Sequence, residues 1–588
     1  MDGIMKLRSM STTLMLFLAI SLVGCSSNKK TSTDEYGPIA REFASIYMTI
    51  HPLTGSSLGF TAADSSLFTF STDEINVVKT RLGILKKRIE STSFKNLSDE
   101  EKENIDLVML WIKGEMFALN ELKAHSYNPL IYCSAIDDAL FQTLCRPHKP
   151  YRGEAARYLK RVSRIPALIS SARTNLDRAS EVDLGLAIES MDSTLSRAVM
   201  IDELFTERYE KSPSKTLSST IDSISAFRTF LSKRINNEPR SRNIIGAENL
   251  SKILLYDEYV TADQNALIND AERLIDRLKA RRGSLLRSIK LRDQLLGEKK
   301  NERKTDVAKK AASSKGANEL ETSLERFYDS RGNEQDLIRL YRTINKLSNG
   351  SVLKSNKVPV RAYRIESPWR YCRPGKNPIL SPERRRCAGT CPFILNCCGR
   401  GRTELVIAYS SVWANSGDEE ILFNLLKGSS RIFAPVFSIC TSGDTVRAIL
   451  RSSTYIYGWY YEEMGQMIER FPLKKEELSI RFIDEKITEL AMMIASLQLN
   501  SGATTLSEAE NKLARLAGMT GEEAARGARI ASCCPSTSLR GISIVLLDKL
   551  YKTISMRFDV KNPRKMLRKE MLKYRGMPLM MILKKENE

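Results

Sequence analysis

The chain has 588 residues, of which 42% are hydrophobic and 27% charged, an ordinary composition for a globular protein with a large core or several domains. Its net charge of +21 favours an anionic neighbour such as nucleic acid, lipid head groups or a cell-wall polymer. The three histidines are His51, His125 and His148, so the sequence has no His-x-x-x-His pair and a conventional HExxH zinc hydrolase is excluded.

The N-terminus is similar to a bacterial lipoprotein signal. Lys6 and Arg8 precede a short apolar run, Leu14–Leu22, and a Leu-Val-Gly-Cys sequence ends at Cys25. The run is shorter than the ~20 residues that span a bilayer. In such a signal a diacylglycerol is attached to the cysteine and the chain is cut before it. We therefore expect an exported protein, held at a membrane by its lipid, for which nucleic acid is a poor candidate partner. A plain secretory signal or an uncleaved anchor is the alternative.

Export changes how the other ten cysteines are interpreted, because disulfides persist in oxidising compartments. Half of them fall in one short basic segment, at Cys372, Cys387, Cys391, Cys397 and Cys398. Disulfides or buried thiols are the favoured interpretation, and a metal knuckle is the alternative, since the spacing is not a standard zinc pattern. Elsewhere Cys145 and His148 lie close together in a proline-containing loop, where we do not expect catalysis.

The N-terminal half is predicted to be helical. Apolar residues from Phe43 to Ile50 mark a helix that stops at His51 and Pro52. Ser71 and Glu74 have the spacing of a capping box before an amphipathic helix that continues through Ile89. A further helix opens after Leu97-Ser98, and a long one is expected over about 262–296.

The C-terminal half is predicted to combine helices with a small sheet. Residues 352–364 alternate in places and 403–409 form a β-type run. Residues 419–463 predict two consecutive helices joined by a turn at 441–444, and 478–499 a strongly apolar helix. Two carboxylates in the second of the consecutive helices, Glu462 and Glu463, are expected to be solvated rather than to bind a cation.

The chain also carries a series of short motifs in order: Pro52, Leu58-Gly59, Leu97-Ser98, Asn128-Pro129-Leu130, Tyr132, Arg164-Ile165-Pro166, Asn175-Leu176, Ile245-Gly246, Glu248 and Ser367-Pro368-Trp369. Together they resemble the DUF885 family, bacterial proteins assigned to the HExxH-type metallopeptidases. The resemblance implies a mainly α, large multi-helix metallopeptidase-like fold with a small β element between helical halves.

The family's zinc site is where the chain departs from this pattern. The family has a His-Glu-x-x-Pro-Gly-His-type motif on one helix and Glu-Gly-Trp on the next. The scaffold positions persist as Pro435, Gly458 and Trp459, whereas the ligand and base positions are Arg431, Ile432, Phe437 and Tyr457. None of these four replacements is a usual zinc ligand or general base. A later cleft motif, Pro-Gly-Gln in the family, is represented by Pro535-Ser536-Thr537.

We therefore expect an extracytoplasmic, lipid-anchored protein that is a catalytically inactive peptidase homologue with a binding or structural role, without a catalytic residue, metal or cofactor. The alternatives are a metal-dependent hydrolase with a relocated site and a basic envelope scaffold that binds anionic lipid or polymer through its C-terminal lysines and arginines. A packed terminal helix is the other reading of that basic tail. The expected organisation is a signal peptide at 1–24, a polar tether at 25–36, an N-terminal helical region at 37–296, a charged flexible insertion at 297–319, and a C-terminal region at 320–588 that contains the cysteine-rich segment 372–398 and the degenerate site.

Overall fold

The computed structural model describes residues 35–144, 150–212, 215–235, 244–302, 315–330, 333–347, 360–364, 393–396, 404–409, 418–427, 444–558 and 562–587. Several residues singled out above lie outside these ranges: Cys25, Cys145, His148, Cys372, Cys387, Cys391, Cys397, Cys398, Arg431, Ile432, Pro435 and Phe437. The described part is mainly helical, as the sequence predicts.

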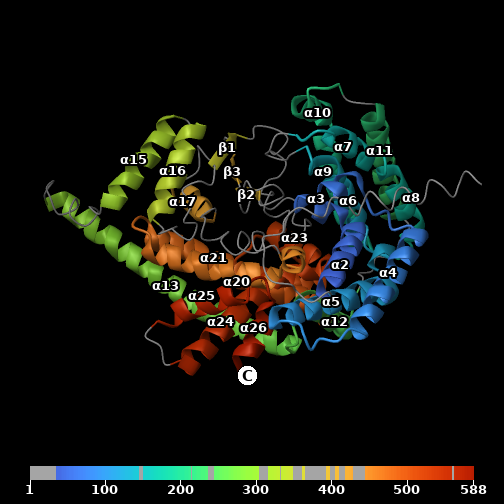
Figure 1. The fold of residues 1–588 in the computed structure, drawn as a ribbon. Helices are drawn as coiled ribbons and strands as arrows, with labels where there is room; N and C mark the ends of the chain where they lie inside the picture. Colours follow the sequence, from blue (N-terminus) through green and yellow to red (C-terminus); the bar gives the residue numbers. More distant parts are fainter. Residues whose placement is uncertain are drawn as a thin grey trace, which may run out of the picture.

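The helices form an arc, with α2–α11 on the right of Figure 1, α20–α26 along the bottom and α15–α17 on the left. The first group of elements is α2 (Tyr36–Ile50), α3 (Pro52–Ser57), η1 (Thr61–Ser65), α4 (Thr72–Glu90), α5 (Asp99–Phe117), η2 (Ala118–Leu122), η3 (Ala124–Ser126), α6 (Leu130–Phe141), α7 (Glu154–Val162), α8 (Ile165–Asn175), α9 (Glu181–Ala198), α10 (Ile201–Tyr209), α11 (Lys215–Ile235) and α12 (Ala247–Glu258).

The long α13 (Gln264–Glu302) leads from this group to α15 (Lys315–Asp329), α16 (Glu334–Leu347) and α17 (Asp418–Lys427). The remaining helices are α19 (Thr445–Ile449), α20 (Ser453–Arg470), α21 (Lys475–Ser501), α22 (Leu506–Ala517), α23 (Gly521–Cys533), η7 (Pro535–Ser538), α24 (Leu539–Phe558), α25 (Pro563–Lys573) and α26 (Leu579–Asn587). Three short strands, β1 (Val360–Arg364), β2 (Phe393–Asn396) and β3 (Glu404–Tyr409), form a sheet in the order β1-β3-β2. In it β1 runs parallel to β3, with Val360 opposite Leu405, and β2 runs antiparallel, with Phe393 opposite Ile407.

Polar side chains fix where several helices begin. Complete capping boxes open α5 at Ser98, α22 at Thr505 and α23 at Thr520, because each hydroxyl accepts from the third residue of its helix and the glutamate there reaches back. The capping box expected at Ser71 is only half formed. Ser71 Oγ accepts from Glu74 N at 3.3 Å, but the Glu74 carboxylate accepts from Thr69 N and Oγ1, both at 2.7 Å.

The second of the two helices predicted in 419–463 is broken. The helix α19 ends at Ile449, and α20 begins after Ser452, whose hydroxyl accepts from Tyr455 N at 3.1 Å. A distant side chain strengthens this start, because the carboxylate of Glu258 accepts the N–H of Ser453 at 2.6 Å. Helical periodicity alone could not reveal a partner almost two hundred residues away.

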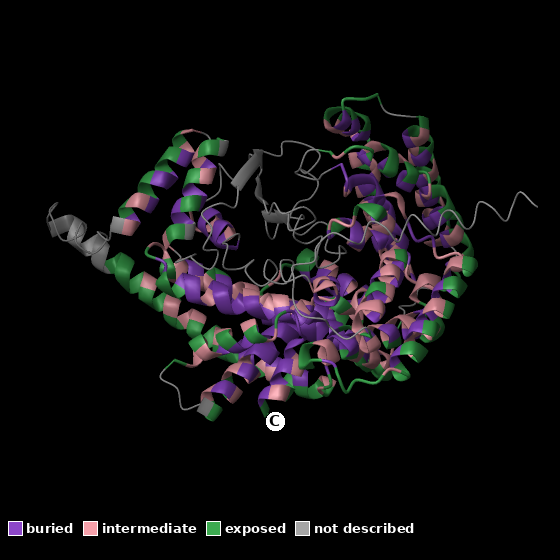
Figure 2. Cartoon of the chain, viewed as in Figure 1, coloured by how far each residue is buried: buried purple, intermediate pink, exposed green. Residues whose placement is uncertain are grey.

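Buried apolar residues form three clusters, seen as the purple stretches in Figure 2. The largest joins α12 and α13 to α15–α17 and α20–α26. The other two lie among α6–α11 and among α2–α5, and each receives residues from the C-terminal part: Ile530 and Cys533 of α23 in the first, Val446 and Ile449 of α19 in the second. The N-terminal and C-terminal helices are therefore packed into one another.

Among the described helices, no single one is long and apolar enough to cross a membrane. The helices 521–533 and 535–557 reach that length and apolarity only when taken together, and they meet at an angle of 116°.

Candidate functional site

The Tyr457-Gly458-Trp459 motif lies in the first half of α20, where it packs against α24 and α26. Trp459 is fully buried, and a Cβ on Gly458 would lie 2.6 Å from Leu579 Cδ1, so a larger residue would require the Leu579 side chain to move. The half-buried ring of Tyr457 lies under the guanidinium of Arg540, 4.9 Å from ring centroid to Cζ. The structure thus places a cation beside the Tyr457 ring.

Arg540 is in turn held by a carboxylate of α21. Its Nη1 donates to Glu489 Oε1 at 2.5 Å, and both side chains are 13% exposed. Burial opposes the charged guanidinium, but the neighbouring Glu489 and Tyr457 raise the pKa of Arg540 well above its usual range. Charge in this pair is balanced, so the Glu489 carboxylate is already engaged by a permanent cation.

A second balanced pair involves Glu485, one turn before Glu489 on α21. Lys427 Nζ of α17 is 2.6 Å from Glu485 Oε2, and the hydroxyl of Tyr460 donates to Glu485 Oε1 at 2.8 Å. Burial alone would raise the pKa of Glu485, but the Lys427 ammonium and the Tyr460 hydroxyl hold it below its ordinary value. Four helices, α17, α20, α21 and α24, are therefore tied together here by charged hydrogen bonds.

The prediction that Glu462 and Glu463 are solvated is wrong. Both are buried on α20: Glu463 pairs with Arg568 of α25, and Glu462 accepts from Gln466 Nε2 at 2.5 Å. Burial raises the pKa of Glu462. Their apolar neighbours on α20 gave a helical pattern, but the pattern did not show that α25 covers this face.

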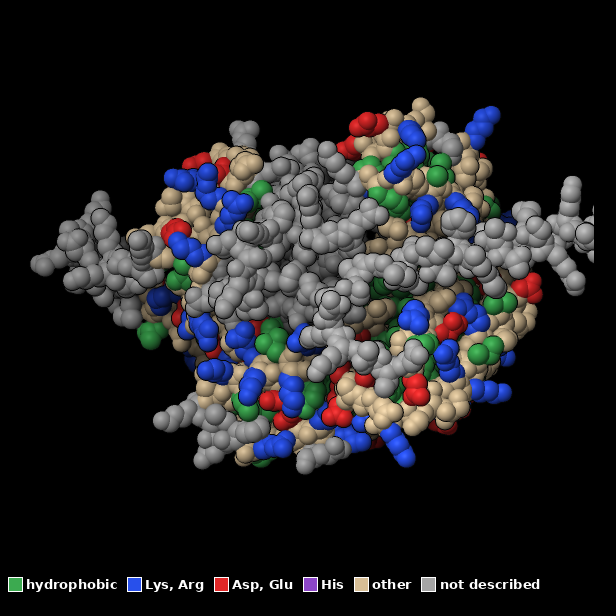
Figure 3. Space-filling model, in the orientation of Figure 1, with side chains coloured by type: hydrophobic (Ala, Val, Ile, Leu, Met, Phe, Trp, Pro, Cys, Tyr) green, Lys and Arg blue, Asp and Glu red, His purple; other side chains and the backbone are tan. Residues whose placement is uncertain are grey.

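Basic residues of the C-terminal tail also take part in packing. Arg564 Nη1 is 2.7 Å from Glu469 Oε2 and Lys585 Nζ is 2.5 Å from Glu103 Oε1, so the last two helices are tied to α20 and α5. On the face shown in Figure 3, lysine and arginine side chains are spread over the described surface and are interspersed with aspartate and glutamate.

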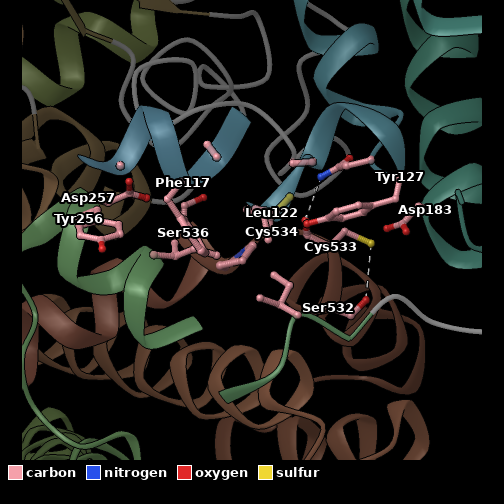
Figure 4. Close-up of a pocket in the computed structure, with 17 residues that line it drawn as sticks. Phe117, Leu122, Tyr127, Asp183, Tyr256, Asp257, Ser532, Cys533, Cys534 and Ser536 are labelled. Atoms are coloured by element: carbon pink, nitrogen blue, oxygen red, sulfur yellow. Dashed lines mark hydrogen bonds between the residues drawn. The ribbon is translucent and has the colours of Figure 1, made fainter. Parts of the chain in front are cut away.

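A cavity of about 290 Å³ lies where α5, α9 and α12 meet α23 and η7 (Figure 4). Three motif segments that the sequence singled out come together in its wall, through Asn128, Ile245, Pro535 and Ser536. The amide of Asn128 donates to Cys533 O at 3.4 Å and so links the N-terminal side of the cavity to the C-terminal side. The full lining is Gly114, Phe117, Ala118, Leu122, Ala124, Tyr127, Asn128, Asp183, Ile245, Ile253, Tyr256, Asp257, Ser532, Cys533, Cys534, Pro535 and Ser536.

Two features of the chain shape this cavity. A Cβ on Gly114 would lie 3.0 Å from Tyr256 Cβ, so glycine allows α12 to approach α5 closely. At its C-terminal end α5 passes into the π-helical turn η2, whose residues Ala118 and Leu122 face the cavity, and the turn ends at Lys123 with φ +50°. Such π-helical turns are frequent at functional sites.

Asp257, a residue that the sequence reasoning missed, is the most perturbed carboxyl of the cavity. Its side chain lines the cavity and is exposed there. Desolvation, with the charges of Glu258 and Glu115, raises the pKa of Asp257 to about 7, against the opposing effect of His51. His51 Nε2 itself lies 2.6 Å from Glu115 Oε1. No local motif marks Asp257, because Glu115 belongs to α5 and His51 lies between α2 and α3.

Asp183 and Cys533 form the other polar end of the cavity. Asp183 is buried and accepts from Ser180 Oγ at 2.7 Å. Burial, together with the Asp183 carboxylate, raises the pKa of the Cys533 thiol well above its usual range. Cys533 therefore stays protonated and is no thiolate nucleophile.

Among the described residues, no group of three histidine, cysteine, aspartate or glutamate side chains could hold a metal ion.

No family model matches the chain, and no curated protein matches its sequence. Two solved structures share its fold over almost their whole length. A candidate lipoprotein of unknown function from Shewanella oneidensis has a TM-score of 0.59 at 13% identity, and the match covers 95% of this chain and 100% of that one. A candidate lipoprotein from Colwellia psychrerythraea has a TM-score of 0.63 at 11% identity, with 94% and 98% covered. At these identities the likeness shows a common fold.

Proposed function

We propose that this chain is an exported lipoprotein, anchored through Cys25, whose DUF885-like body has lost the zinc-peptidase site and acts by binding at the membrane surface. Three observations support the proposal. The N-terminal sequence is similar to a lipoprotein signal, the motif series resembles the family, and the fold is shared with two candidate lipoproteins over nearly the whole chain.

The observation that best supports the proposed loss of catalysis is the arrangement of Tyr457, Arg540 and Glu489. A zinc site needs lone pairs from three side chains and an open position for water. Tyr457 instead faces the guanidinium of Arg540, 4.9 Å away, and Arg540 occupies Glu489 at 2.5 Å. The fixed guanidinium of Arg540 would repel a metal cation beside Tyr457. We therefore infer that Tyr457 and Arg540 hold helices together and do not bind a metal.

The test is metal analysis of the purified full chain together with peptide hydrolysis in the presence and absence of a chelator. We expect less than stoichiometric zinc and no chelator-sensitive cleavage. One zinc per chain with chelator-sensitive cleavage would overturn the proposal. If metal is found, serine replacement of Cys387, Cys391, Cys397 and Cys398 shows whether those cysteines hold it.

The anchor is tested separately with Cys25→Ser. Wild-type chain should incorporate labelled fatty acid and sediment with membranes, and the variant should do neither. Equal membrane association of the two forms would contradict lipid anchoring at Cys25.

A further inference from the structure

The cavity beside Asp257 has an unusual charge for this protein. The chain carries a net charge of +21, yet the cavity lining contains two aspartates and no lysine, arginine or histidine. Figure 4 shows Asp257 and Tyr256 at one end and Asp183 and Tyr127 at the other, with Phe117 among the labelled residues between them. The lining is therefore acidic at both ends and largely apolar or aromatic elsewhere.

The two carboxylates are not equivalent. Asp183 already accepts a hydrogen bond from Ser180 at 2.7 Å and lies against the Cys533 thiol. Among the described residues none donates a hydrogen bond to the carboxylate of Asp257, whose side chain is open to the cavity. The carboxylate oxygens of Asp257 are thus available to accept hydrogen bonds from a ligand.

The aromatic wall suits the rest of such a ligand. The rings of Phe117 and Tyr256 pack against each other with centroids 5.8 Å apart, and both line the cavity beside Asp257. Aromatic rings bury apolar groups, and the Lys252 ammonium, 5.5 Å from the Phe117 centroid, already supplies a cation to that ring. A cavity of about 290 Å³ is at the lower end of the ~300–1,000 Å³ range that is typical of small-molecule sites.

From this combination we propose that the cavity binds a small organic cation, a protonated amine carrying an apolar group, with the ammonium on Asp257 and the apolar part against Phe117 and Tyr256. The inference deepens the binding role proposed above by naming a ligand class. It does not depend on the loss of zinc, because the cavity and the Tyr457–Arg540 pair are separate features.

The charge state of Asp257 makes binding dependent on pH. Glu258 of the same helix and Glu115 of α5 disfavour its ionisation, and His51 favours it. The other titratable groups of the lining are Asp183 of α9, the Cys533 and Cys534 thiols, and the phenols of Tyr127 and Tyr256. With the pKa of Asp257 at about 7, the site is ionised at pH 8 and largely neutral at pH 5.

The experiment titrates the purified full chain with benzylamine and, as its uncharged counterpart, with benzyl alcohol, using calorimetry. At pH 8 we expect benzylamine to bind at least tenfold more tightly than benzyl alcohol. Its affinity at pH 5 should be at least fivefold lower than at pH 8. Asp257→Asn should abolish the preference for the amine. Asp222→Asn, which removes an exposed carboxylate on α11 away from the cavity, should keep it.

A folded wild-type chain that fails to bind the amine, or that binds both probes equally, overturns the inference. So does an amine preference that survives in Asp257→Asn. If Asp257→Asn does not fold, the pH dependence of the wild-type chain decides, and an affinity equal at pH 5 and pH 8 refutes the role of Asp257. Zinc content and peptide cleavage of the same preparation report on the proposed function independently, so the two failures are distinguishable.

Discussion

Glu258 connects α12 to the start of α20 through four hydrogen bonds. Its Oε1 accepts from Ser453 N at 2.6 Å, and its Oε2 accepts from Ser452 Oγ at 2.5 Å, Thr454 Oγ1 at 2.8 Å and Thr454 N at 3.1 Å. The residue is 4% exposed. Burial raises the pKa of Glu258, and the donors of α20 act in the opposite direction.

Glu258→Gln keeps the shape of this side chain and replaces one acceptor oxygen by an NH₂ group. The hydroxyls of Ser452 and Thr454 can rotate to accept from the new amide, but a backbone N–H cannot. Whichever way the amide is turned, Ser453 N or Thr454 N loses its acceptor, which costs ~1–3 kcal/mol for a buried donor. We expect the free energy of unfolding to fall by about 1–3 kcal/mol. Removal of the charge adds nothing to this loss, because the raised pKa shows that burial already disfavours the ionised form.

The loss is measured by urea unfolding followed by circular dichroism, with native-state hydrogen exchange at the amides of Ser453 and Thr454 as the local readout. Glu248→Gln is the matched control on the same helix. Glu248 is 83% exposed and pairs with Lys252 at 3.0 Å, so its replacement should change stability by less than about 0.5 kcal/mol. If Glu258→Gln is as mild as this control, the carboxyl is already protonated in the folded chain and the reasoning is refuted.

Three further predictions concern helix contacts and the cavity. Gly541→Ala should lower the free energy of unfolding by about 2 kcal/mol, because the new Cβ would lie 2.6 Å from the carbonyl oxygen of Glu489. The control Gly83→Ala meets no atom within 4 Å and should raise the free energy of unfolding by ~0.5–1 kcal/mol. Thermal unfolding measures both variants, and equal melting temperatures would contradict this prediction. Arg540→Ala should cost about 3 kcal/mol by leaving Glu489 without its cation, and the double variant Arg540→Met with Glu489→Gln should recover part of that loss in urea unfolding. Since the folded-state pKa of Asp257, about 7, is raised above its ordinary value, the folded chain holds more protons than the unfolded chain between those two pKa values, and stability falls as pH rises through that window. Asp257→Asn should therefore melt progressively higher relative to wild type from pH 5 to pH 8, and a constant difference would show that the pKa is not raised.

Much of the helical architecture could be predicted from the sequence. Apolar spacing located α4, α13 and α21 to within a few residues at most of their ends, and Leu97-Ser98 marked the start of α5. These features are local, since periodicity and caps depend on residues three or four positions apart. The absence of a His-x-x-x-His pair is equally a property of the sequence alone.

The predictions that failed involve partners that are distant along the chain. Ser71 and Glu74 have capping-box spacing, but the Glu74 carboxylate accepts hydrogen bonds from Thr69 and Arg164 instead of from the Ser71 backbone. Arg164 Nη2 lies 2.6 Å from Glu74 Oε1. Glu463 falls in a helix that could be solvated, and only the packing of α25 shows that Arg568 meets it. Hydrogen-bond geometry and burial between helices leave no periodic trace in the sequence.

The candidate site divides in the same way. The sequence by itself determined that the chain has no His-x-x-x-His pair, because that statement needs only residue identities in order. Only the tertiary structure decided that Arg540 and Glu489 lie against it, and that Asp257 faces a cavity in a desolvated, like-charged environment. Electrostatic environments depend on distances between helices, and those distances exist only once α5, α12, α20, α21 and α24 have packed together.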